Sequence, residues 1–171
     1  MTTTPTPPGT ANSGRVLAQP PAAEPRRVLI VVDEPCTSPE LCASLRHYAD
    51  DRPLEALVIA PARDSSATQW YVDEDAARAD ATHRLRGCVA CLARDGIRAR
   101  GELGDRDPVQ AISDALHDFA ADEILVVTPR QRPSRWLRPN VIARARHTFP
   151  YPIEHLAMPA TPETGSPRTF S

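Results

Sequence analysis

Two kinds of hydrophobic pattern alternate along the chain. One kind is a short, continuous apolar run, found at residues 28–32, 54–60 and 124–127. Such runs are typical of strands that are buried on both faces of a parallel sheet. Two further segments, 97–103 and 151–157, either alternate apolar with charged residues or carry prolines, so we expect them to be edge strands. The pattern predicts five strands, three in the interior and two at the edges.

Between these strands, apolar residues recur every three or four positions, which predicts four helices. We expect the first helix to be capped by Ser38, with Pro39 at its first position, and the third to open at Asp107 and Pro108. The second should span 73–94 and the last about 140–148. The expected inward-facing residues are Leu41, Leu45 and Tyr48; Ala77, Ala81, Leu85, Cys88, Val89 and Leu92; Val109, Ile112, Leu116 and Phe119; and Val141, Ile142 and Ala145.

The alternation of strands and helices predicts a single-domain α/β fold. We expect an open parallel five-stranded sheet with helices on both faces, and right-handed crossovers favour the strand order 3-2-1-4-5. In that order the direction of winding reverses between the first and fourth strands, and ligands of such folds bind in the crevice at the carboxyl ends of the strands. The candidate ligand-binding residues of this crevice are Asp33, Glu34, Ala60, Gly104, Asp105, Thr128, Arg130 and Arg132.

Length and composition limit the chain to one core. Its 171 residues, 41% of them apolar, suffice for a single domain at 26–157, flanked by Pro- and Thr-rich tails at 1–25 and 158–171 that we expect to be disordered. The formal charge of −2 argues against nucleic-acid binding. No run of the roughly 20 apolar residues that a membrane span needs is present. We therefore expect a soluble cytoplasmic protein without membrane contact.

Four segments carry a resemblance to a known family. They are RRVLIVVDEP, in which Asp33 closes the first strand, GDRDPVQAISDAL, ADEILVVTP and the closing FPYPIEHLA. Over residues 26–157 the chain resembles a universal stress protein (UspA-like) domain, in the wider adenine nucleotide alpha hydrolase-like group of folds. The resemblance implies the same sheet order, a nucleoside-facing role for Asp33, and a homodimer formed through the last strand.

The chain departs from the family pattern at the loop after the fourth strand. ATP-binding members of the family carry a Gly-x-x-Gly motif there, followed by Gly-Ser or Gly-Thr, whereas this chain reads TPRQRPSRWLRPN. Proline has no N–H to offer a phosphate, and side chains obstruct its approach to the backbone. We therefore expect no cofactor, with ATP or AMP disfavoured. The arginines of this loop, Arg130, Arg132, Arg135 and Arg138, either bind a small anion or fringe a solvated loop.

The cysteines and histidines do not show the spacing of a metal site. Cys88 and Cys91 have CxxC spacing but lie far inside a predicted helix, whereas a redox pair normally sits at a helix N-terminus. A four-thiolate zinc site with Cys36 and Cys42 would need a closer spacing between those two. We expect buried, inert cysteines and no bound metal.

Catalysis is also not expected. Asp33, Asp105 and Thr128 have the strand-end positions of a phosphoacceptor receiver domain, but such domains need a lysine, and every one of the 20 basic residues is arginine. The chain also lacks a Walker loop and a Gly-x-Ser-x-Gly motif.

The sequence thus predicts a non-catalytic universal-stress-protein-like module in stress response or regulation. We expect it to act through dimerisation, with Tyr151, Ile153 and His155 at the dimer interface, or through an unidentified protein partner. The alternative is a nucleotide- or anion-binding sensor in which arginines replace the glycine loop.

Overall fold

The computed structural model describes residues 23–33, 39–49, 52–61, 74–130 and 139–158. Five strands and four helices alternate along these residues. The strands are β1 (Arg26–Val32), β2 (Leu54–Pro61), β3 (Arg98–Gly104), β4 (Glu123–Pro129) and β5 (Ile153–Met158), and the helices are α1 (Pro39–Ala49), α2 (Glu74–Arg94), α3 (Pro108–Asp118) and α4 (Pro139–Thr148). No helix in these ranges is long and apolar enough to cross a membrane.

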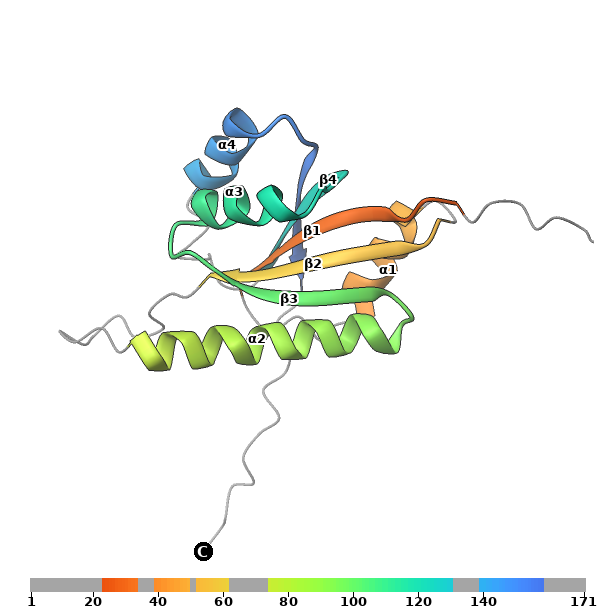
Figure 1. The fold of residues 1–171 in the computed structure, drawn as a ribbon, viewed down its shortest axis with the longest axis horizontal. Helices are drawn as coiled ribbons and strands as arrows, with labels where there is room; N and C mark the ends of the chain where they lie inside the picture. Colours follow the sequence, from red (N-terminus) through yellow and green to blue (C-terminus); the bar gives the residue numbers. More distant parts are fainter. Residues whose placement is uncertain (1–22, 34–38, 50–51, 62–73, 131–138, 159–171) are drawn as a thin grey trace, which may run out of the picture.

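The strands form one parallel sheet in the order β3-β2-β1-β4-β5 (Figure 1). The predicted topology is therefore confirmed, with β1 at the centre and β3 and β5 at the edges. At the carboxyl end of β1, Val32 pairs with Val127 of β4, whereas the pairing of β1 with β2 ends one residue earlier, at Val31. Because all strands run the same way, their carboxyl ends meet at one edge of the sheet.

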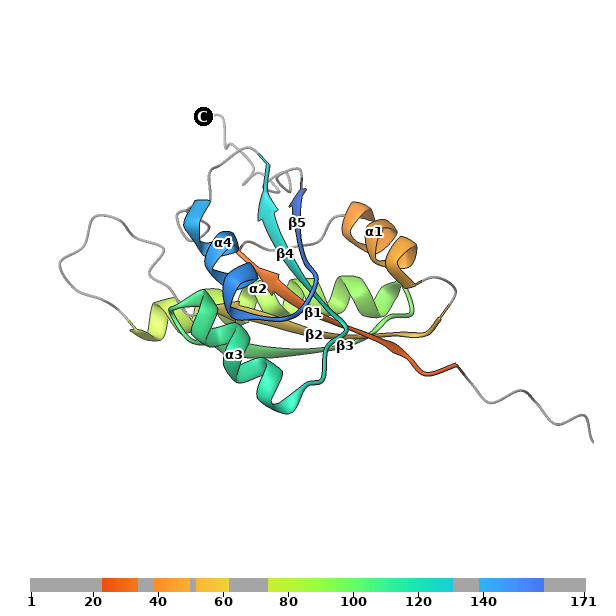
Figure 2. The same ribbon diagram turned by 90° about the horizontal axis from the view of Figure 1, so that it is seen from above.

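Helices cover both faces of the sheet. Figure 1 shows α2 on the face opposite α3 and α4, and Figure 2 gives the same layers seen from above. Alternate residues of β1 lie in separate cores: Ile30 packs with α1 and α2, whereas Leu29 and Val31 pack with α3 and α4. A strand buried on both faces has to be apolar throughout, which explains the continuous run at residues 28–32.

Helix starts and turns follow the local sequence. Three of the four helices begin with a proline, whose missing N–H is not needed in the first turn. The Asp107 side chain caps α3 by accepting a hydrogen bond from the Val109 N–H at 2.9 Å. The turn after α2 contains Gly96 with a φ of 76°, a conformation that glycine adopts without strain.

Several predicted details are corrected. Apolar residues of β3 alternate with charged ones, yet Leu103 is 40% exposed, because it lies at the edge of the sheet beside Leu85 and Val89 of α2, which leave it partly uncovered. Strand β5 begins at Ile153 rather than at residue 151. Ile142 is half-buried rather than buried, and the predicted cap Ser38 lies outside the described residues.

Candidate functional site

The candidate crevice is centred on the carboxyl ends of β1 and β4. Asp33 directly follows β1, and its N–H donates to the Val127 carbonyl at 3.3 Å, so pairing with β4 continues beyond the strand. Asp33 is 2% exposed and Thr128 is 6% exposed. Two polar side chains are therefore buried on neighbouring strand ends, where the fold predicts a ligand.

Thr128 is joined to the last strand through its side chain. Its Oγ1 lies 2.8 Å from Nε2 of His155, and the tautomer of the imidazole decides which of the two donates. The Thr128 side chain is buried, whereas His155 is exposed. The pair therefore links β4 to β5 from the crevice to the surface.

Gly104 and Asp105 lie at the end of β3, where they shape the start of α3. A Cβ on Gly104 would come within 2.8 Å of the Ala111 Cβ, so only glycine allows β3 to approach α3 this closely. The Asp105 Oδ1 accepts a hydrogen bond from the Asp107 N–H at 2.8 Å. Both residues thus hold the β3–α3 turn in place, whatever further role they have.

The cap of α3 also reaches α4. The Asp107 Oδ2 lies 3.3 Å from Nη2 of Arg144, in an exposed ion pair. The hydrogen bond from Val109 is the largest cause that lowers the pKa of Asp107, and Arg144 adds to it. Asp107 is therefore an ionised carboxylate that connects two helices.

The remaining crevice candidates are scattered. Ala60 is fully buried in the core formed with α1 and α2, so its side chain faces into the protein. Arg130 has an exposed side chain, and its N–H donates to the Met158 carbonyl. Glu34 and Arg132 lie outside the described residues, as do Arg135 and Arg138. In the described residues, Asp33, Thr128 and Arg130 thus lie at the carboxyl ends of the adjacent strands β1 and β4, whereas Gly104 and Asp105 lie at the end of β3, which β2 separates from β1.

A buried arginine that the sequence pattern did not predict lies at the same edge of the sheet. Arg84 on α2 is 3% exposed and donates from Nη2 to the Pro61 carbonyl at the end of β2, at 2.8 Å. Its Nη1 pairs with Asp80, one turn earlier in the helix. The available signal was its position three residues after Ala81, within the apolar stripe of the helix, where a charged residue needs a buried partner.

The predicted dimer residues differ in exposure. Ile153 is 7% exposed and packs into the core with α3 and α4, and Tyr151, which precedes β5, is half-buried against the same core. Only His155 has an exposed side chain. The side chains that β5 presents to solvent are therefore mainly polar.

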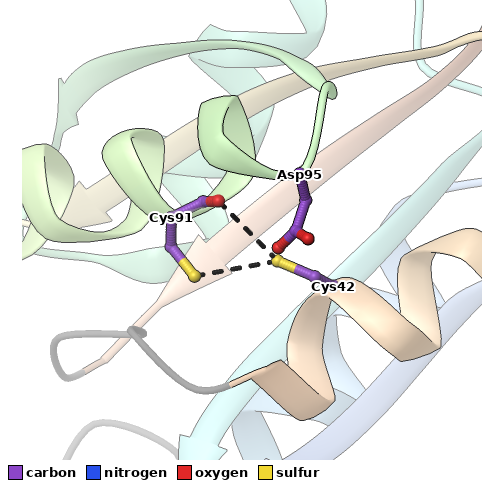
Figure 3. Close-up of side chains that lie close together, drawn as sticks. All are labelled: Cys42, Cys91 and Asp95. Atoms are coloured by element: carbon purple, nitrogen blue, oxygen red, sulfur yellow. Dashed lines mark hydrogen bonds between the residues drawn. The ribbon is translucent and has the colours of Figure 1, made fainter.

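The cysteine that lies beside Cys91 is Cys42, which is distant in the sequence, and not the nearby Cys88. Cys42 on α1 and Cys91 on α2 place their Sγ atoms 3.7 Å apart, and Asp95, just after α2, directs its carboxylate at the Cys42 sulfur (Figure 3). Cys88 is buried one turn before Cys91. Burial is the largest cause that raises the pKa of the Cys42 thiol, followed by the Asp95 carboxylate. The structure thus brings together residues from two helices.

A hollow of about 500 Å³ lies between α2 and the edge strand β3. Mostly apolar side chains line it, among them Leu85, Val89 and the exposed Leu103, and Gly101 forms part of its floor. The hollow lies at edge strand β3, which β2 separates from β1, and none of its described lining residues is acidic.

Comparisons with known proteins give fold-level matches only. No family model matches the chain, and no curated protein matches it. A universal stress protein family structure from Burkholderia pseudomallei is 20% identical, with a TM-score of 0.51 over 78% of this chain and 96% of that one. A universal stress protein from Archaeoglobus fulgidus is 18% identical, with a TM-score of 0.50 over 76% of this chain and 97% of that one.

A universal stress protein from Archaeoglobus fulgidus in complex with dAMP is 17% identical, with a TM-score of 0.51. It matches 76% of this chain and 96% of its own. Each of these structures is matched over 96% or 97% of its own length. The chain therefore has the universal stress protein fold.

Proposed function

We propose that the protein is a non-catalytic module of the universal stress protein fold that acts through contacts with a second copy of itself along β5. The observation that carries the proposal is the position of β5. It is the last strand of the sheet in the described part of the chain, and it pairs with β4 on one side only. An edge strand offers a row of N–H and C=O groups to another strand.

The hydrogen bonds of β5 indicate which groups face outward. The Pro152 carbonyl accepts from the Ile124 N–H and so faces β4. Because successive residues of a strand direct their backbone groups to opposite sides, residues 153, 155 and 157 face outward. Arg146 already uses one of these groups, since its Nη2 lies 3.2 Å from the Ile153 carbonyl. Pairing along the whole edge would require this guanidinium to move aside.

The Thr128–His155 contact supports a non-catalytic role. A threonine hydroxyl beside an imidazole is a combination that nucleophilic catalysis uses. Here the hydroxyl is buried at 6% exposure and ties β4 to β5. In our proposal this contact holds β4 and β5 together and takes no part in catalysis.

The proposal is tested by the mass of the full chain in solution, measured by light scattering across a concentration series. We expect a dimer that weakens at least tenfold in Ala157→Pro, because proline removes an outward-facing N–H without disturbing the bonds to β4. Arg146→Ala serves as the matched variant, since it frees the Ile153 carbonyl and should preserve or tighten the dimer. A monomer at all concentrations, or a dimer indifferent to Ala157→Pro, would contradict the proposal.

A second candidate is nucleotide or anion binding in the β1–β4 crevice. It is favoured by the dAMP complex of a protein with the same fold and by the buried Asp33 and Thr128 at the crevice. Against it stands the segment 129–139, which contains prolines and no glycine. We propose that any phosphate bound there is held by arginine side chains in place of backbone N–H groups.

Titration calorimetry with ATP, ADP, AMP and cyclic AMP distinguishes the two candidates. Binding that is lost in Arg130→Ala or Arg132→Ala would establish the second candidate. Asp33→Asn should then weaken binding of nucleosides while leaving inorganic phosphate unaffected. Absence of heat with all four nucleotides would leave the protein-contact function as the one supported.

A further inference from the structure

Three potential metal ligands converge where α1 meets the end of α2. Cys42, Cys91 and Asp95 each offer one ligand atom, and these atoms all lie within 4.8 Å of one another (Figure 3). Cys42 and Cys91 are 49 residues apart, so only the packing of the two helices brings them together. Two thiolates and a carboxylate form a ligand set that suits zinc. We propose that these three residues bind one zinc-class divalent cation.

The distance between the two sulfurs fits such an ion. In a tetrahedral zinc site with Zn–S bonds of about 2.3 Å, two sulfurs lie about 3.8 Å apart. The Cys42 and Cys91 Sγ atoms are 3.7 Å apart. A disulfide would need them at about 2.05 Å, so the two sulfurs are not bonded to each other in this structure. The observed spacing therefore favours a shared metal over a covalent bond.

Burial gives the site a closed side and an open side. Cys42 is 1% exposed and Cys91 is 4% exposed, so both sulfurs are shielded from water. The Asp95 side chain is 30% exposed. A cation can enter from the Asp95 side, where a water molecule or an external ligand can complete the tetrahedron.

The charges around the cluster balance with a divalent ion present. Two thiolates and one carboxylate carry three negative charges, which a divalent cation reduces to one. Arg46 on α1 pairs with Oδ1 of Asp95 and neutralises the remainder. A carboxylate has a second oxygen, so Asp95 can bind the metal while Arg46 orients it. Arg46 is therefore a positioning residue for the site.

The proposed site joins two helices on the same face of the sheet. In the present structure α1 and α2 share the core that contains Ile30 and Leu45, and Cys42 and Cys91 belong to that core. A bound cation would fix the helices to each other. The inference does not depend on the proposed function, since the cluster is separate from both β5 and the β1–β4 crevice residues.

Metal content of the full-length protein is the direct test. Protein produced with zinc in the medium and purified under reducing conditions without chelators is examined by native mass spectrometry and elemental analysis. We expect one zinc per chain. Replacement by cobalt should give a near-ultraviolet thiolate charge-transfer band with an intensity that corresponds to two sulfurs, and X-ray absorption should show two sulfur and two oxygen or nitrogen neighbours.

Variants assign the ligands. Cys42→Ser and Cys91→Ser should lower zinc affinity at least a hundredfold in a chelator competition. Arg46→Ala should lower it about 10- to 100-fold, as outer-shell partners do. The matched control is Cys88→Ala, which removes a buried thiol of the same helix outside the cluster and should retain the metal. Circular dichroism of each variant distinguishes loss of a ligand from loss of the fold.

Three results would overturn the proposal. One is reduced wild-type protein that takes up no zinc or cobalt at stoichiometric concentration. Another is metal that depends on Cys88 and survives in folded Cys42→Ser. The third is a metal-free protein whose mass is lower by two hydrogens and whose mapped peptides join Cys42 to Cys91, since this would identify the pair as a disulfide.

Discussion

Two carboxylates, one at a helix start and one at a strand start, form hydrogen bonds and ion pairs that connect elements of the fold. Asp107 caps α3 and pairs with Arg144, and Glu123 at the start of β4 is 3% exposed and pairs with Arg26 at 3.0 Å. The two carboxyls respond to pH in opposite directions. Hydrogen bonding lowers the pKa of Asp107, whereas burial raises the pKa of Glu123 despite the opposing effect of Arg26.

Asp107→Ala should lower the free energy of unfolding by about 1 kcal/mol at neutral pH, because the cap of α3 is lost. A carboxyl with a lowered folded pKa stabilises above its unfolded pKa, and this contribution disappears as the pH falls through the folded value. The difference from wild type should therefore shrink in acid. Urea unfolding between neutral and acidic pH measures it.

The control for the cap is Asp118→Ala at the other end of α3, which should change stability by less than about 0.5 kcal/mol. Equal losses from both variants would show that the general charge of the helix, and not the cap, is responsible.

Glu123→Gln should change the free energy of unfolding with a pH dependence opposite to that of Asp107→Ala. A carboxyl whose folded pKa is raised stabilises below its unfolded pKa, and this contribution is lost as the pH rises through the folded value. Relative to wild type, the variant should therefore become more favourable as the pH rises above the usual range of a glutamate. Thermal unfolding across pH provides the measurement. If the stability of Glu123→Gln falls relative to that of wild type as the pH rises, the assignment is wrong.

At the scale of elements, close packing of β3 against α3 depends on one glycine. Gly104→Ala should lower the free energy of unfolding by about 1 to 3 kcal/mol, because the new Cβ would overlap the Ala111 Cβ at 2.8 Å. Gly101→Ala in the same strand is the matched control. Its Cβ would meet only the side chains of Val89 and Leu85 at 3.2 Å or more, so its effect should be smaller.

A combined Gly104→Ala and Ala111→Gly variant should recover part of the loss, apart from about 1 kcal/mol for a glycine within a helix. Chemical denaturation of the three variants measures this. If Gly101→Ala proves the more damaging change, the packing explanation is wrong.

The element boundaries could largely be predicted from the sequence. Continuous apolar runs marked the interior strands, and the strand order followed from crossover handedness. The exposure of Leu103 was less predictable, because this residue lies on the α2 side of β3 together with Gly101 and yet is 40% exposed at the edge of the sheet. Arg84 was missed for the converse reason, since its partner, the Pro61 carbonyl, is a backbone group that no side-chain pattern reveals.

The site was predictable only in part. Asp33 and Thr128 could be placed because strand ends meet at one edge of a parallel sheet. Cys42 and Cys91 could not be paired, since their contact depends on how two helices cross on the sheet face. Spacing within the chain suggested Cys88 as the partner of Cys91, whereas tertiary packing supplies Cys42.

For the whole molecule, the parallel sheet sets the order of local stability. β1 lies between β2 and β4 and is covered on both faces, whereas β3 and β5 each have one neighbouring strand among the residues that the structure describes. We expect amide hydrogen exchange to be slowest in β1 and to be faster in β3 and β5, because edge strands open without disrupting the centre. Exchange followed by nuclear magnetic resonance measures this, and protection in β3 that exceeds protection in β1 would contradict it.

The separation of the two cores by the sheet bears on how substitutions combine. Leu45 packs on one side of the sheet and Ile112 on the other, whereas Leu45 and Ile30 share a core. Energetic effects at Leu45 and Ile112 should add within about 0.5 kcal/mol, while those at Leu45 and Ile30 should show coupling. One hydrophobic layer could thus be redesigned while the other, with its share of the strand residues, keeps its native sequence.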